Sequence, residues 1–491
     1  MLPTPHPLFN SFCQPSSTFI LVIAFIAVLM NGCGTSGTSG PHLSGNTEVT
    51  VMLTSTGNDQ LQSFQIGLSS ITLTSQSGKT VNLLTTSTAA EFMHINGGAE
   101  PLVTVSIPQD VYTAAASPNL STEFECATFV PPNTIDTNTI GDPFGGPNAT
   151  ISFPSPITIT GESMFLSLNL QVSKSVTLSS CYNPNGPVQW TFTPTFTLTP
   201  LTLSAQPTNP ENGEVSGVHG EITSIDTANG GFTISLSVEE GFRTLSISSN
   251  TATVYQGISD FAALSVGTFV DMDGAAQPDG TLLATRIAVE DTGAVNVITG
   301  PVELVNGQVP VLNMLLREEE GASFSNQEIL GGGFPFNFSN ATFQISGQLA
   351  NLQNLPFTPS FNASNIIDGQ NIYLSAPAIP TGGPPLDART ITLIPQTIDG
   401  TVSATNNAGS FAVYTVTLAP YDLFPDLTVA PNQQSYLINP NQVEVYVDSN
   451  TQMLNSTPVT VGNTLRFYGL IFNDGGTLQM DCAQINDGVA E

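Results

Sequence analysis

The sequence predicts an all-β protein, with an N-terminal β-sandwich followed by three tandem small OB-like β-barrels. Three observations support this fold class. Apolar and polar residues alternate with a period of two over most of the chain, which is the pattern of half-buried strands. Only 9% of the 491 residues are charged, while 43 Gly and 36 Pro favour turns. A motif near the middle of the chain recurs near its C-terminal end.

Residues 47–205 are predicted to form the β-sandwich. Stretches such as TEVTVMLTS, FQIGLSSITLTS and FLSLNLQVS alternate strictly, and turn clusters such as NGGAEP and NPNGP separate them. Two packed sheets are the usual way to bury such strands. Trp190, the only tryptophan, lies in the last long alternation, so we expect it to pack in the core.

The remaining chain is predicted to hold three repeats of one module. After a Pro/Asn/Gly linker at 206–214, the first repeat covers 215–292 and contains VGTFVDMDGAAQPDGTLLATRI. The third repeat, 398–491, contains the matching VGNTLRFYGLIFNDGGTLQMDCAQI. Residues 293–397 read as a weaker copy with a Phe- and Asn-rich insertion. A period of about 90–100 residues indicates tandem domains rather than a solenoid.

The repeated motif also predicts details of the module. Gly267 and Gly274 allow the tight bends that a small curled sheet needs. Aligning the two copies at their final Ile places Cys482 opposite Ala284, which predicts a small buried hydrophobic residue. The third copy has two extra residues before Ile485, which predicts a bulge. In the insertion of the second repeat, Phe at every second position predicts a buried strand.

Two stretches of the chain resemble families of unknown function. The frame G-x-[IV]…F-x-[IV]…V-G-x-x-[VL]…DGTL-x-A-x-x-I is similar to a domain common in exported proteins of soil bacteria. That domain often occurs in tandem behind a lipoprotein signal, and the resemblance implies a small β-barrel without established catalytic residues. SFQIGLSSITLTSQSGKTVNLL and SIPQDVYTAAA resemble exported bacterial β-domains.

The N-terminus resembles a bacterial lipoprotein signal, assigned here to residues 1–33. The apolar run Phe19–Met30 has the length of a signal-peptide core, and Gly32 and Cys33 follow it. The resemblance implies lipidation of Cys33, a flexible tether at 34–46 and attachment to the membrane of the cell envelope, facing outside the cytoplasm. An ordinary cleaved signal and an uncleaved anchor remain alternatives.

Export also bears on the cysteines. An oxidising compartment permits disulfides, and Cys126 and Cys181 lie in one predicted domain, so they could pair.

The charge of the chain argues against nucleic acid as a partner. The net charge is −31, from 38 acidic and seven basic residues that are scattered along the sequence. Such a chain repels polyphosphates and anionic lipid surfaces.

No catalytic, cofactor or metal residues are predicted, because the sequence lacks the usual zinc, phosphate-loop and nucleophile motifs. His219 reads as a partly exposed turn residue rather than a general base. Asp271 and Asp273, two apart on one strand with Asp279 nearby, read as an acidic outer face, with a loose calcium site as the alternative. The run Glu318–Glu320 reads as a solvated hairpin tip.

The sequence therefore favours a non-enzymatic binding or structural module of the cell envelope, whose ligand is an envelope protein or a polysaccharide. The alternative is a carbohydrate-active or other hydrolytic enzyme with a site built from scattered carboxylates. Fold alone excludes neither.

Overall fold

The structure is a computed structural model, and its described part spans residues 43–486. The gaps in that part are 57–60, 85, 96, 119, 131–133, 143–147, 179–189, 237–242, 304–310, 322–332, 350–351, 378–384, 420–440, 455–456 and 474–476. Cys33 and Cys181 lie outside the described residues, and of Cys126 only the backbone is described. The lipid anchor and the disulfide therefore stay predictions.

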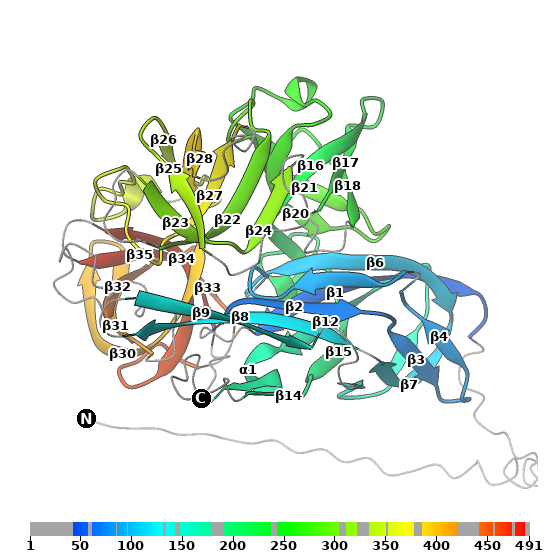
Figure 1. The fold of residues 1–491 in the computed structure, drawn as a ribbon. Helices are drawn as coiled ribbons and strands as arrows, with labels where there is room; N and C mark the ends of the chain where they lie inside the picture. Colours follow the sequence, from blue (N-terminus) through cyan, green and yellow to red (C-terminus); the bar gives the residue numbers. More distant parts are fainter. Residues whose placement is uncertain are drawn as a thin grey trace, which may run out of the picture. The chain divides into compact units, whose positions relative to one another are not determined.

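The predicted all-β class is confirmed, and the N-terminal strands form two main sheets in the described residues (Figure 1). The nine-stranded sheet has the order β4-β3-β7-β10-β15-β12-β1-β6, with β11 paired to β7. Its strands are β1 (Asn46–Thr56), β3 (Thr72–Ser75), β4 (Thr80–Asn82), β6 (Ala99–Pro108), β7 (Asp110–Ser117), β10 (Ala149–Ser152), β11 (Ile157–Ile159), β12 (Ser163–Gln171) and β15 (Phe196–Leu201).

The second sheet is four-stranded, with the order β5-β2-β8-β9. It contains β2 (Leu61–Leu68), β5 (Thr88–Glu91), β8 (Ser121–Val130) and β9 (Thr134–Asp142). A one-turn helix α1 (Val172–Ser175) and the ribbon β13 (Val176–Leu178) with β14 (Trp190–Phe192) complete this part. Side chains of both sheets, such as Leu53 and Phe64, share one core, and Trp190 packs against it half-buried.

The first barrel closes through its own strand pairing. Its sheet order is β18-β17-β16-β20-β21-β19, and an additional parallel pairing of β18 with β21 closes the ring. The long first strand pairs with both β17 and β20, as in a small barrel of the OB type. The strands are β16 (Glu214–Asp226), β17 (Gly231–Ser235), β18 (Thr244–Ser248), β19 (Val254–Gln256), β20 (Phe269–Ala276) and β21 (Leu282–Ala288).

The third barrel repeats this pairing strand for strand, with the order β32-β31-β30-β34-β35-β33 and closure between β32 and β35. Its strands are β30 (Gln396–Ala408), β31 (Phe411–Leu418), β32 (Gln442–Val447), β33 (Gln452–Met453), β34 (Thr464–Asn473) and β35 (Leu478–Asn486). Gly274 pairs with Ala284 and Gly469 pairs with Cys482, so the predicted equivalence of Ala284 and Cys482 is confirmed. Cys482 is buried, as predicted.

The bulge predicted in the third copy is present, but the two extra residues are not its cause, because the first barrel has one as well. Both barrels have a register shift at the same place, between Asp273 and Gly274 and between Tyr468 and Gly469. The extra residues instead lengthen the following hairpin, because the pairing continues to Asn473 with Leu478.

The middle sheet has the same order of strand pairing as the first and third barrels, with additional short strands. Its order is β26-β29-β27-β22-β23-β25-β28, with β24 also paired to β22. The strands are β22 (Asn296–Glu303), β23 (Val311–Leu315), β24 (Glu318–Gly321), β25 (Gly333–Asn337), β26 (Thr342–Ile345), β27 (Asn371–Ala376), β28 (Leu386–Asp387) and β29 (Thr390–Leu393). The predicted burial of Phe334, Phe336 and Phe338 is confirmed.

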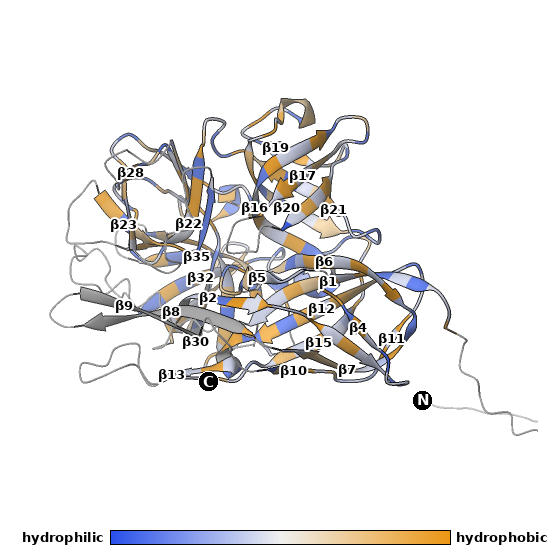
Figure 2. Ribbon diagram, turned by 45° about the vertical axis from the view of Figure 1, so that its right-hand side comes forward, coloured by the Kyte–Doolittle hydropathy of each residue, from blue (hydrophilic) through white to orange (hydrophobic). Residues whose placement is uncertain are grey.

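Hydrophobic packing links these sheets beyond their own cores. Strand β1 is buried on both faces, because Leu53 points into the sandwich while Met52 joins the core of the first barrel. Leu470 and Phe472 of β34 likewise pack into the core of the middle barrel. Figure 2 shows apolar and polar residues alternating along the strands. Within the described residues, no helix combines the length and the apolar character needed to cross a membrane.

One glycine has the same role in all three barrels. Gly220, Gly300 and Gly400 lie at equivalent points of the first strand, where the second strand passes close by. A Cβ on Gly220 would stand 2.7 Å from the carbonyl oxygen of Ser235, and one on Gly400 would stand 2.6 Å from that of Thr417. The recurring G-x-[IV] of the sequence is therefore a steric requirement of the small barrel.

We expect Gly400→Ala to lower the free energy of unfolding by about 2 kcal/mol, because an added methyl group must displace the neighbouring strand. Urea unfolding followed by circular dichroism measures the loss. The matched control is Gly98→Ala, whose Cβ would have its nearest neighbour at 3.7 Å. Equal stability of the two variants would contradict the claim that a Cβ at residue 400 collides with the neighbouring strand.

Candidate functional site

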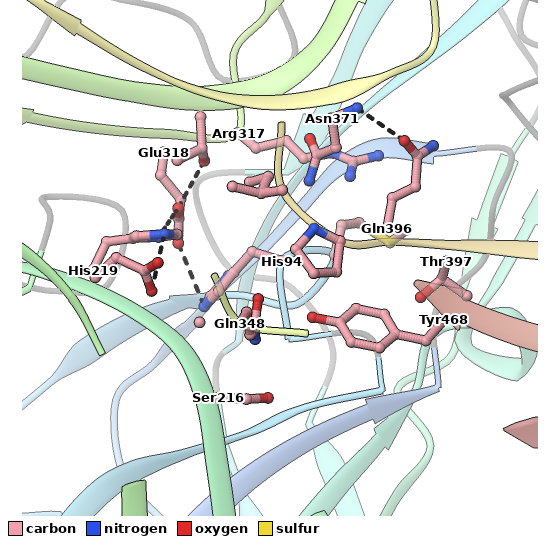
Figure 3. Close-up of a pocket in the computed structure, with 16 residues that line it drawn as sticks. His94, Ser216, His219, Arg317, Glu318, Gln348, Asn371, Gln396, Thr397 and Tyr468 are labelled. Carbon is pink, nitrogen blue, oxygen red and sulfur yellow. Dashed lines mark hydrogen bonds and ion pairs between the residues drawn. The ribbon is translucent and has the colours of Figure 1, made fainter. Parts of the chain in front are cut away.

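A small polar cavity lies where the sandwich and all three barrels contribute side chains (Figure 3). Its volume is about 80 Å³. His94 follows β5 of the sandwich, His219 lies on β16, Glu318 on β24 and Tyr468 on β34. Other lining residues are Ser216, Arg317, Gln348, Asn371, Gln396 and Thr397.

The barrel topology explains why polar side chains meet here. His219, Thr299 and Asp399 each directly precede the equivalent glycine of their barrel, so they occupy equivalent places on the first strand. Because side chains alternate along a strand, the neighbours of core residues face outward from the barrel. Outward positions of one barrel are buried here by the next module, so they need polar partners.

His219 lies within strand β16, so its interpretation as a turn residue was wrong. Its Nδ1 is 3.0 Å from Oε2 of Glu318, and its Nε2 is 3.9 Å from Oδ1 of Asp271. The side chain is only 10% exposed and its ring centroid is 5.2 Å from that of Tyr373. Burial alone would lower the pKa of His219, but the negative charges of Glu318 and Asp271 outweigh it and raise the pKa above 6.5.

Glu318 is the carboxylate on which both histidines converge. Its Oε2 accepts a hydrogen bond from Thr299 Oγ1 at 2.7 Å, and its Oε1 is 3.8 Å from Nε2 of His94. Burial opposes ionisation of Glu318, but the charges of His219 and His94 lower its pKa to about 2. The interpretation of Glu318–Glu320 as a solvated hairpin tip was wrong, because all three residues are buried in β24.

His94 was not singled out from the sequence. Its Nδ1 is 3.1 Å from Oε2 of Glu91, and its Nε2 is 3.0 Å from Oε2 of Glu100. Ionised carboxylates only accept hydrogen bonds, so this geometry favours a ring with a hydrogen on both nitrogens. Arg243 of the first barrel also donates to Glu100. The sequence signal for these ion pairs was the spacing of Glu91, His94 and Glu100 in EFMHINGGAE.

Glu91 also fixes the backbone that presents His94. Its Oε1 accepts the N–H groups of Phe64 at 2.7 Å and Met93 at 3.0 Å, and its Oε2 accepts the N–H of His94 at 2.7 Å. A fully buried carboxylate therefore receives several hydrogen bonds, which offset its loss of hydration. The turn after β5 is held in one conformation as a result.

The acidic outer face assigned to Asp271 and Asp273 is also wrong. Nη2 of Arg286 is 2.6 Å from Oδ2 of Asp271, and Nε of Arg286 is 2.5 Å from Oδ2 of Asp273. Asp273 further accepts the N–H of Gly217 at 2.9 Å. Because a guanidinium stands beside both carboxylates, the arrangement disfavours the calcium alternative.

Asp279 does not join that pair. Its Oδ1 accepts the N–H and the hydroxyl of Thr281 within the exposed hairpin tip. Within the described part of the chain, no three His, Cys, Asp or Glu side chains are arranged to hold a metal ion.

The network has a definite chemical consequence. A general base needs a neutral imidazole, but each ring nitrogen of His94 faces a carboxylate, and the charges of Glu318 and Asp271 favour the cationic form of His219. Glu318, with a pKa of about 2, cannot donate a proton near neutral pH. The arrangement is suited to joining modules by buried ion pairs rather than to proton transfer.

Comparisons with known proteins add one family match. A family described as a domain of unknown function, DUF5666, matches residues 219–288, which include most of the strands of the first barrel. No curated protein matches the chain.

The ion pair of His219 gives stability a pH dependence. The pKa of His219 in the folded protein lies above the usual 6.5. The ion pair therefore contributes fully to the free energy of unfolding below about pH 6.5, and this contribution is lost as the pH rises through the folded pKa. We expect His219→Gln to cost about 3 kcal/mol at pH 5.5 and clearly less at pH 9. Urea unfolding at both pH values measures the difference.

The matched control for this experiment is Glu162→Gln, which changes an exposed residue of the sandwich. It should alter the free energy of unfolding by no more than about 0.5 kcal/mol at either pH. A loss in His219→Gln that is the same at both pH values would contradict the ion-pair interpretation.

Proposed function

We propose that this chain is an exported, lipid-anchored protein of the cell envelope that acts as a non-enzymatic binding or structural module outside the cytoplasm. Its β-modules together form one folded part, which lipidated Cys33 tethers to the membrane. The observation that carries the non-enzymatic part is the convergence of His94 and His219 on Glu318, with distances of 3.8 and 3.0 Å. Both histidines and Glu318 are engaged in these ion pairs, which favours a rigid junction over proton transfer.

Further support comes from the net charge of the chain. A chain with a net charge of −31 stays soluble and repels nucleic acid and anionic lipid, so the membrane attachment must come from the lipid. The expected partners are an envelope protein or a polysaccharide, and the expected position is the envelope, facing away from the cytoplasm.

A second candidate, a hydrolytic enzyme acting on carbohydrate, has one specific observation in its favour. Glu214 and Asp481 line a larger cavity. Burial, and to a smaller extent the charge of a nearby carboxylate, raises the pKa of Glu214 to about 7 and that of Asp481 to about 6. Glycoside hydrolases need one carboxylic acid that stays protonated near neutral pH.

An assay for polysaccharide hydrolysis distinguishes the non-enzymatic module from the hydrolytic enzyme. We expect no new reducing ends when the protein is incubated with a panel of bacterial and plant polysaccharides. Hydrolysis that falls at least a hundredfold in Glu214→Gln would establish the enzyme and overturn the non-enzymatic proposal.

The anchor is tested by intact-mass analysis of the N-terminus together with membrane fractionation in the native host. We expect a mature chain that begins at a lipid-modified Cys33 and sediments with membranes. In Cys33→Ser we expect the protein to lose both the added mass and the membrane association. An unmodified mature N-terminus elsewhere would refute the lipid anchor.

A further inference from the structure

A second cavity, much larger than the junction cavity, lies among the three barrels. Its volume is about 690 Å³, within the range of about 300–1,000 Å³ that is usual for small-molecule sites. Glu214 and Arg286 of the first barrel line it, together with Asp481 of the third barrel. The middle region contributes Gly347, Gln348, Leu349, Leu352 and Gln353. Ser216, Gln348 and Tyr468 line both this cavity and the junction cavity.

The lining of this cavity is strongly acidic. Glu214, Asp273, Asp448 and Asp481 contribute carboxylates, against the single guanidinium of Arg286. That guanidinium is already bonded to Asp273 and to Asp271, which lies outside this cavity. The charge inside the cavity is therefore negative and only partly balanced by the protein.

Side chains of the cavity lining also carry hydrogen-bond acceptors that lack donors. Gln484 is only 7% exposed and lines the cavity, and its Oε1 has no hydrogen-bond partner. Oε1 of Gln452 and Oε2 of Glu214, from two other strands of the same lining, are buried without a partner as well. Buried polar atoms are normally satisfied. A rotation of these side chains would turn the unpartnered oxygens into the cavity, where a ligand that donates hydrogen bonds would satisfy them.

We propose that this cavity binds a small organic cation with primary ammonium groups. Ammonium carries three donors and a positive charge, which matches unpartnered oxygens in an acidic lining. A calcium ion would need six to eight oxygens at about 2.3–2.6 Å, whereas no such grouping of acidic ligands occurs in the described residues. The shared chemistry is that of an aliphatic polyamine or of an amino sugar, and this inference rests on the non-enzymatic binding role.

The titration of the lining groups supports the same ligand. Burial first, and then the charge of Asp273, raise the pKa of Glu214 to about 7, while burial and Asp448 raise that of Asp481 to about 6. A bound cation favours the ionised carboxylates, so binding releases protons and strengthens as the pH rises from 5 to 8. The other titratable or charged groups that line the cavity are Asp273, Arg286, Asp448, Tyr468 and Cys482.

The test is isothermal titration of the full mature chain with spermidine, with putrescine and with glucosamine, using 1,4-butanediol and glucose as neutral analogues. We expect at least one ammonium compound to bind, and neither neutral analogue to do so. We expect Glu214→Gln and Asp481→Asn each to weaken that binding at least tenfold. The exposed-site control Glu162→Gln should bind as the unmodified protein does.

Both variants remove a charge from a group that faces another carboxylate, so their melting temperatures should be no lower than that of the unmodified protein. If either fails to fold, the pH dependence of the unmodified protein decides, and affinity must rise between pH 5 and 8.

Three results would overturn the proposal: no ammonium compound binds, the neutral analogues bind equally well, or the variants bind unchanged. Calcium binding that the same variants abolish, without any amine binding, would replace it with a metal site. None of these results involves hydrolysis, so they are distinct from failure of the non-enzymatic role.

Discussion

The neutralisation of buried carboxylates by very few cations is the constraint on which this structure depends. The chain has 38 acidic residues and only seven Lys and Arg, yet it buries Glu91, Glu100 and Glu318 where its modules meet. A buried carboxylate without a partner is costly, and His94 and His219 supply the missing positive charge. The only two histidines after residue 42 are thus both committed to the same junction.

The repeated barrel explains how that junction arises. Gly400 and its equivalents let two strands approach closely, and the preceding residue then faces out of the barrel. In the first barrel this residue is His219, and in the third it is Asp399, which forms a buried two-point ion pair with Arg466. The same backbone position therefore holds a different polar side chain in each barrel, while the strand pairing of the first and third barrels is the same.

Much of the fold followed from the sequence, because period-2 alternation and the G-x-[IV] frame depend on neighbours within one module. The equivalence of Cys482 in the third barrel and Ala284 in the first is an example. The junction did not follow, because the partner of His94 at Glu318 comes from a distant part of the chain. Three consecutive Glu look solvated in sequence, and only the packing of other modules reveals that they are buried.

The most direct test of this account is an NMR titration of the His219 imidazole in the unmodified protein and in Glu318→Gln. The account requires a pKa above 6.5 in the unmodified protein, and a lower value once the Glu318 charge is removed. A His219 that titrates at or below 6.5, or that is indifferent to Glu318→Gln, would contradict the claim that this ion pair joins the modules.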